Sequence, residues 1–282
     1  MIGLFLVVFV TFLVWLMTPD WQFLASPNRV GVIEIRGLIE SVQDSLKAFR
    51  EFRKDANVKC ILLRIESPGG GIGASQELYR EVKRTTEVKP VVASLGGIAA
   101  SGGYYIASAA SRIVANPGTI TGSIGVISYF PNLRELLEKI GITAVIIKSG
   151  RFKDIGNPDR EMTQEERELL QGTMDEAHRQ FIRDVALGRN LPEEKIREIA
   201  DGRIIMGERA QQLGLVDELG NFEDAVKASA VLGKIEEEPE LVYAKKKKSS
   251  LLDLLLGSGM SETVDALLSG SLNFLRYQAP GF

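Results

Sequence analysis

An α/β fold with a mainly parallel sheet is the fold class that the sequence predicts, from three observations. From Val30 onward, apolar runs of strand length alternate with stretches of amphipathic helical spacing. Glycine-rich turns follow several of the apolar runs, as at Gly69–Gly71. The 282-residue chain is 45% hydrophobic and can bury a sizeable core. Such alternation implies parallel strands joined by helical crossovers.

The secondary-structure elements are expected in a regular order along the chain. Strands are expected at 30–35, 58–65, 91–95, near 113, near 126 and at 143–147. Helices are expected at 41–54, 74–86, 133–140, 163–187, within 206–219 and at 222–232. The helix at 163–187 opens with Thr163-Gln164-Glu165-Glu166, the pattern of a capping box. No second boundary interrupts this alternation, so residues 28–235 are expected to form one domain.

The N-terminal stretch 1–24 is expected to be a membrane anchor. Its first 17 residues carry no charged side chain, and a membrane span needs roughly 17–25 apolar residues. Trp15 and Trp21 suit the interface at its exit. A cleavable signal peptide is the alternative, but no Lys or Arg precedes the apolar run. Asp20 directly follows the apolar stretch, and the first arginine comes only at Arg29. This charge distribution favours an orientation in which the rest of the protein lies outside the cytoplasm.

Composition excludes several classes of protein. A net charge of −3 does not suggest a nucleic-acid partner. The only cysteine, Cys60, lies in an apolar run and is expected in the core. The only histidine, His178, excludes sites with several histidine ligands. Because His178 falls near the apolar stripe of the long helix, we expect it to be half-buried and structural rather than catalytic.

Three glycine-rich turns carry the candidate chemistry, at residues 69–71, 101–103 and 119–125. In a parallel sheet, turns after the carboxyl ends of strands meet on one rim, where ligands bind. Ser101 stands between a strand and a helix and is either a nucleophile or a simple helix cap. The amides of Gly70 and Gly102 would then be suited to stabilise a developing oxyanion.

A base for Ser101 is expected in the segment 147–154, which leaves a strand and enters a loop. Lysine acts as a general base when desolvation and positive neighbours disfavour its ammonium form. Lys153 is better placed in the loop than Lys148, which still belongs to the strand end. A solvated side chain remains the alternative for Lys153.

Four blocks of sequence resemble a known family. They are Ser67-Pro-Gly-Gly-Gly71, Ala99-Ala-Ser-Gly-Gly-Tyr-Tyr105, Thr121-Gly-Ser-Ile-Gly125 and Lys148-Ser-Gly-Arg-Phe-Lys-Asp154. In this order they are similar to bacterial signal peptide peptidase A in its short, single-repeat form. The resemblance covers most of residues 30–235 and implies the spiral of ββα units seen in Clp proteases and crotonases.

The resemblance also implies an activity and roles for individual residues. Ser101 matches the nucleophile, Lys153 the general base and Ser123 a hydroxyl that orients the lysine. Gly70 and Gly102 match the oxyanion-hole donors. The implied reaction is hydrolysis of membrane-borne remnant signal peptides, without metal or cofactor. The implied assembly is a ring-shaped homo-oligomer, anchored by its N-terminal helices, in which Ser and Lys meet either across subunits or within one.

Two other functions remain as alternatives to the peptidase. The fold also suits a crotonase-like acyl-CoA enzyme, and an anchored chain with an intact-looking site also suits a non-catalytic scaffold. Residues 236–282 are expected to be a tail, with Lys245–Lys248 as a charged linker. From Leu251 the tail has helical apolar spacing. We therefore expect it to lie in or near the substrate groove or at a subunit seam.

Overall fold

The computed structural model describes residues 28–245 and 276–278, so the expected anchor at 1–24 and most of the tail lie outside the described residues. The strands are β1 (Arg29–Arg36), β2 (Val58–Ser67), β3 (Gly69–Gly71), β4 (Val91–Ala99), β5 (Arg112–Ala115), β6 (Ile120–Gly122), β7 (Ile204–Met206), β8 (Glu218–Leu219), β9 (Glu240–Tyr243) and β10 (Arg276–Gln278). The helices are α2 (Gln43–Lys54), α3 (Ile72–Thr86), α4 (Gly102–Ala107), α5 (Arg134–Lys139), α6 (Gln164–Arg189), α7 (Glu193–Arg197), α8 (Gly207–Gln212) and α9 (Phe222–Gly233). Across these ranges, no helix is long and apolar enough to cross a membrane.

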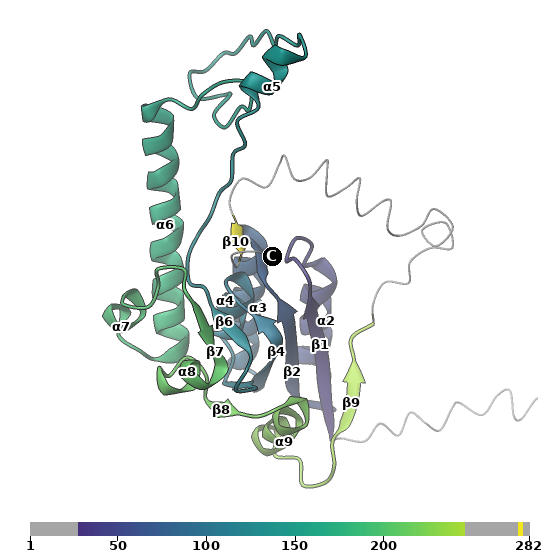
Figure 1. Cartoon of the computed structure of the whole chain (residues 1–282). Coiled ribbons are helices and arrows are strands. Elements are labelled where there is room, and N and C mark those ends of the chain that lie inside the picture. The colour runs from purple at the N-terminus through teal and green to yellow at the C-terminus, as the bar shows by residue number, and fades with distance from the viewer. Residues whose placement is uncertain (1–27, 246–275, 279–282) are drawn as a thin grey trace, which may run out of the picture.

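A mainly parallel sheet forms the centre of the molecule (Figure 1). Its strands follow the order β7-β6-β4-β2-β1-β9, and β5 pairs with both β4 and β8. Among the described strands of this sheet, only β7 runs antiparallel to its neighbour, β6. The predicted α/β fold is therefore confirmed. Because β9 pairs with β1, the sheet continues beyond residue 235 and takes in the first part of the expected tail.

Both faces of the sheet are buried, as parallel strands require. In β2, Ile61 and Leu63 face the larger core cluster, which includes side chains of α2, α3, α4 and α6. Cys60 and Leu62 face the opposite cluster beneath α9. Cys60 is fully buried as predicted, and burial raises the pKa of its thiol to about 12. This cysteine is a core residue and not a reactive thiol.

An arm, residues 128–162, leaves the sheet after β6 and carries α5 (Figure 1). The predicted helix at 133–140 is confirmed as α5. The strands predicted near 126 and at 143–147 are wrong: the first segment has only an isolated β-bridge at Ile127, and the second forms no strand. Val145 and Ile147 are 85% and 95% exposed. β-Branched residues form a strand only where a neighbouring strand completes their hydrogen bonds, and this part of the arm pairs with no described strand.

Candidate active site

The three glycine-rich turns meet where β2, β4 and β6 end. The Ala100 N–H donates to the Ser67 carbonyl at 3.1 Å, which joins the second turn to the first. The Ser101 N–H donates to the Gly122 carbonyl at 2.8 Å, which joins the second turn to the third. The convergence predicted from parallel strand topology is thus present, with Ser101 at its centre.

Ser101 occupies a strained position at the start of α4. Its φ of 52° and ψ of −117° lie outside the regions that L-residues prefer, and such a conformation costs of order 1–3 kcal/mol. The residue is fully buried, and its Oγ has no hydrogen-bond partner among the described residues. A buried hydroxyl left unpaired at a strained position is typical of a functional site.

Gly70 directs its N–H toward the edge of β3 that lies away from Ile39. On the other edge, Ile39 donates to the Gly69 carbonyl at 2.9 Å and accepts from the Gly71 N–H at 2.8 Å. Neighbouring residues of a strand direct their N–H groups to opposite edges. The N–H of Gly70 therefore faces away from Ile39.

Gly102 supplies a second backbone donor, next to the serine. The N–H groups of Ser101 and Gly103 donate to Gly122 and Ala100. The N–H of Gly102, at the first position of α4, has no acceptor within the helix. A side chain at Gly103 would place its Cβ 2.9 Å from the Ser67 carbonyl oxygen, so the glycine lets α4 start close to β2.

The edge of β3 opposite Ile39 is paired with an extended segment of the chain itself. Strand β10 runs antiparallel to β3, with Tyr277 opposite Gly70, and it also contacts α3 and α4. The apolar part of the tail, from Leu251, lies outside the described residues. The three described residues of the tail's end lie beside the glycine that was predicted to bind an oxyanion.

Ser123, in the third turn, directly follows Gly122, whose carbonyl accepts from the Ser101 N–H. It has a φ of 49°, is 3% exposed and is held by its N–H, which donates to the Arg203 carbonyl at 2.9 Å. Ser123 lines a cavity of about 360 Å³ together with His178. His178 is half-buried, as expected, and its Nε2 has no partner among the described residues. The lining of this cavity does not include Ser101.

Lys153 lies in the arm, on an exposed turn. Its N–H donates to the Gly150 carbonyl at 3.1 Å, and the loop is joined to α5 by a bond of 2.8 Å from the Leu133 N–H to the Pro158 carbonyl. Figure 1 shows the arm beyond the N-terminal end of α6, away from α4. Within one chain, then, Lys153 does not reach the Ser101 hydroxyl.

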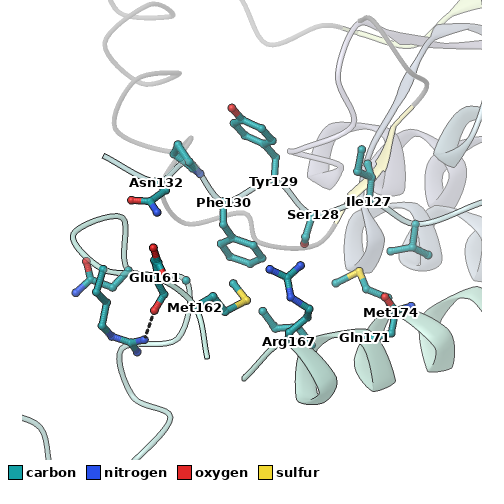
Figure 2. Close-up of a pocket in the computed structure, with 16 residues that line it drawn as sticks. Ile127, Ser128, Tyr129, Phe130, Asn132, Glu161, Met162, Arg167, Gln171 and Met174 are labelled. Atoms are coloured by element: carbon teal, nitrogen blue, oxygen red, sulfur yellow. Dashed lines mark hydrogen bonds between the residues drawn. The ribbon is translucent and has the colours of Figure 1, made fainter. Parts of the chain in front are cut away.

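The arm has a packed side and an exposed apolar side. Between residues 126–132 and the first turns of α6 lies a cavity of about 680 Å³ (Figure 2). Phe130 points toward α6 and Tyr129 points away from it (Figure 2), and Tyr129 is 84% exposed. Other large apolar side chains of the arm are also more than half exposed: Leu136, Ile140, Ile142, Val145 and Ile147. Exposed apolar surface of this extent marks an interaction site.

The sequence interpretation missed Ile39, which supports Gly70. Ile39 acts through its backbone N–H and C=O, so no residue type identifies the role in advance. The sequence offers only one hint of this role, namely that Ile39 comes three residues after the end of β1, close to the rim of the sheet where the turns meet.

A buried serine between a parallel strand and a helix, with backbone N–H groups beside it, is the arrangement expected of a serine-type peptidase. The family model "Peptidase family S49" matches residues 83–236, and the chain belongs to this family. The chain is 47% identical to the protease candidate slr0021 of Synechocystis sp. over 222 aligned residues. The aligned segment covers 77% of this chain and 79% of the relative. It is 37% identical over 258 aligned residues to a relative from Arabidopsis thaliana named "Serine protease SPPA, chloroplastic". This alignment covers 89% of this chain and 38% of the relative.

Two further comparisons agree with this assignment. Protease 4 of Salmonella typhi is 37% identical over 220 residues, 78% of this chain and 35% of the relative. A solved structure of a mutant of the membrane-bound stomatin-specific protease 1510-N superposes with a TM-score of 0.51 at 19% identity. The superposition covers 78% of this chain and 99% of the chain in the solved structure. At this identity the likeness concerns the fold alone, and it agrees with the predicted α/β architecture.

Proposed function

We propose that this chain is a membrane-anchored endopeptidase that uses Ser101 as nucleophile and Lys153 as general base. The proposed catalytic unit is residues 28–235, with residues 1–24 as anchor and the body outside the cytoplasm. Its proposed substrates are remnant signal peptides and other membrane-associated peptides. The observation that carries this proposal is the buried Ser101 hydroxyl at the strained start of α4, which has no hydrogen-bond partner among the described residues.

The proposed reaction is acyl transfer in two halves. The neutral Lys153 amine takes the Ser101 proton as Oγ bonds to the peptide carbonyl carbon. The N–H groups of Gly70 and Gly102 hold the resulting oxyanion. The lysine then gives its proton to the leaving amine, and the C–N bond breaks. In the second half, Lys153 removes a proton from water, which attacks the acyl carbon. The lysine then returns this proton to Ser101 Oγ as the ester C–O bond breaks, which releases the acid product and restores both residues.

We propose that Lys153 comes from a second copy of the chain. In one chain the lysine is on an arm that projects from the sheet, and the Ser101 hydroxyl has no hydrogen-bond partner in the part of the chain that the structure describes. The exposed apolar side of the arm needs a surface to cover it, and an identical neighbour in a closed ring supplies one to every copy. In such a ring Ser123 would orient the incoming lysine.

The substrate is proposed to bind as an extended strand, antiparallel to β3. The pairing of β10 with β3 supports this mode, since it puts a peptide backbone beside the Gly70 N–H. A strand that carries a carbonyl to Gly70 would also meet the Gly102 donor at the start of α4.

Truncation after Ala244 is expected to lower KM for an added peptide by up to about tenfold, because the tail no longer competes for β3. Steady-state hydrolysis of a fluorogenic peptide measures this. The matched variant Tyr277→Pro keeps the tail but removes a backbone N–H from the pairing, so a similar fall in KM is expected. Unchanged KM and unchanged oligomer size in both variants would contradict a competing tail.

The proposed dyad is tested by peptide hydrolysis with the wild type, Ser101→Ala and Lys153→Ala. Wild-type cleavage is expected, with at least about a thousandfold loss in each variant. Full activity in Lys153→Ala beside an inactive Ser101→Ala would show that the base is misassigned and would make His178 the next candidate. An assembled wild type that neither cleaves nor reacts with a serine-directed probe would contradict the proposal as a whole.

A further inference from the structure

A cluster of charged side chains ties the loop that carries Lys153 to the start of α6. At its centre, Arg160 Nε donates to Asp154 Oδ2 at 3.0 Å, and Arg160 Nη1 donates to Glu166 Oε2 at 2.8 Å. The other oxygen of Asp154, Oδ1, accepts from Lys148 Nζ. The side chain of Asp154 is only 10% exposed and that of Glu166 only 4%. Both oxygens of Asp154 are therefore occupied by cations in a partly dry site.

The helix end of this cluster is rigid. Glu166 belongs to the capping box of α6, where its carboxylate accepts from the Thr163 N–H at 2.9 Å. The bond from Arg160, with the bond from the Thr163 backbone, lowers the pKa of Glu166 to about 2. Bonds from Arg160 and Lys148 hold the pKa of Asp154 well below its ordinary value. Both carboxylates consequently stay charged throughout the neutral pH range, and the cluster persists there.

Lys153 differs from its cationic neighbours in the loop. Lys148, Arg151 and Arg160 each form an ion pair with a carboxylate. Within the described part of the chain, Lys153 forms none. Asp154 directly follows Lys153 in the sequence and is an anion that would attract its amine if Arg160 and Lys148 did not bind it first.

We propose that Arg160 and Lys148 are positioning residues for the peptidase reaction. By occupying both oxygens of Asp154, they hold the loop on α6 and leave the Lys153 amine unpaired. An ammonium group paired with a carboxylate gives up its proton less readily, and only the neutral amine can act as a base. This inference rests on the proposed Ser101–Lys153 dyad.

The substitution Arg160→Gln is expected to lower kcat about 30-fold while KM stays within about twofold, because substrate binding at β3 is untouched. The double variant Arg160→Gln/Asp154→Asn is expected to regain most of the lost kcat, since a neutral amide no longer attracts the amine of Lys153. A purely structural role for Arg160 predicts the opposite, because the second substitution removes a further hydrogen bond from the loop.

Two other variants complete the experiment. Arg134→Gln removes an exposed ion pair, with Glu138, from α5 of the same arm and is expected to leave kcat unchanged. Lys148→Met frees the other oxygen of Asp154 without disturbing the start of α6. A kcat loss of about fivefold, again reversed by Asp154→Asn, is expected from it. Lys148→Met therefore provides the same test if Arg160→Gln does not assemble. Oligomer size and thermal unfolding are measured for every variant.

The outcomes separate this inference from the proposed dyad. If Lys153→Ala is inactive but both Arg160→Gln and Lys148→Met keep wild-type kcat, the positioning role falls and the dyad stands. If kcat falls and Asp154→Asn restores none of it in either background, the cluster only supports the fold of the loop, and the inference is overturned. If Lys153→Ala is fully active, the dyad itself is wrong.

Discussion

Co-assembly of the Ser101→Ala and Lys153→Ala proteins is expected to restore peptide hydrolysis to about a quarter of the wild-type rate, although each variant alone is inactive. In a ring whose sites each take Ser101 from one copy and Lys153 from its neighbour, a random equimolar mixture completes a site with a probability of about one half times one half. Coexpression with two different affinity tags, followed by tandem purification, gives the mixed assemblies. Turnover per assembled subunit is the measurement.

The expected gain follows from the position of Lys153 in one chain. The lysine is exposed on a turn of the arm, while the buried Ser101 hydroxyl has no partner among the described residues. A base must come within about 3 Å of the hydroxyl that it deprotonates, so we expect a second copy of the chain to deliver the proposed lysine.

The control for co-assembly is the double variant Ser101→Ala/Lys153→Ala, mixed with either single variant. No site in those mixtures contains both an intact serine and an intact lysine, so they are expected to stay inactive. Lack of activity in the mixture of the two single variants, at wild-type oligomer size, would mean that both residues of the dyad come from one chain after a movement of the arm.

The fold was predictable where local pattern and tertiary packing agree. The capping pattern at Thr163 predicted the start of α6, and the reciprocal bonds between Thr163 and Glu166 are present. The apolar runs that became β1, β2 and β4 are buried on both faces and are recognisable from composition alone. Residues 143–147 have the same composition but form no strand, because a strand also needs a partner that composition does not reveal.

The candidate site was predictable as a set of turns but not as an assembled geometry. A serine between a strand and a helix is visible in sequence, and the topology of a parallel sheet brings its turn beside the other two. The strained φ of Ser101 and the support of Gly70 by Ile39 depend on backbone contacts, which no residue type encodes. The position of Lys153 on a projecting arm was equally hidden, since loop composition does not say where a loop lies.

Gly70→Ala is expected to lower kcat about a hundredfold, which is the usual loss when one oxyanion donor is removed. A Cβ at this position would lie 2.4 Å from the carbonyl oxygen and 2.5 Å from the nitrogen of Ile39. Both are backbone atoms and cannot rotate away, so β3 has to shift and takes the Gly70 N–H out of line with Gly102. Hydrolysis of a fluorogenic peptide at saturating concentration measures the loss.

Two alanine variants separate this loss from the general effects of substituting a glycine. Gly73→Ala, in the first turn of α3, places its Cβ in open space and is expected to keep wild-type kcat. Gly31→Ala in β1 would bring its Cβ within 2.5 Å of the Phe52 ring, which crowds the core far from the serine. It is expected to lower the melting temperature but not the kcat of the folded enzyme. A Gly70→Ala enzyme whose kcat remains within about threefold of wild type would exclude the Gly70 N–H as an oxyanion donor.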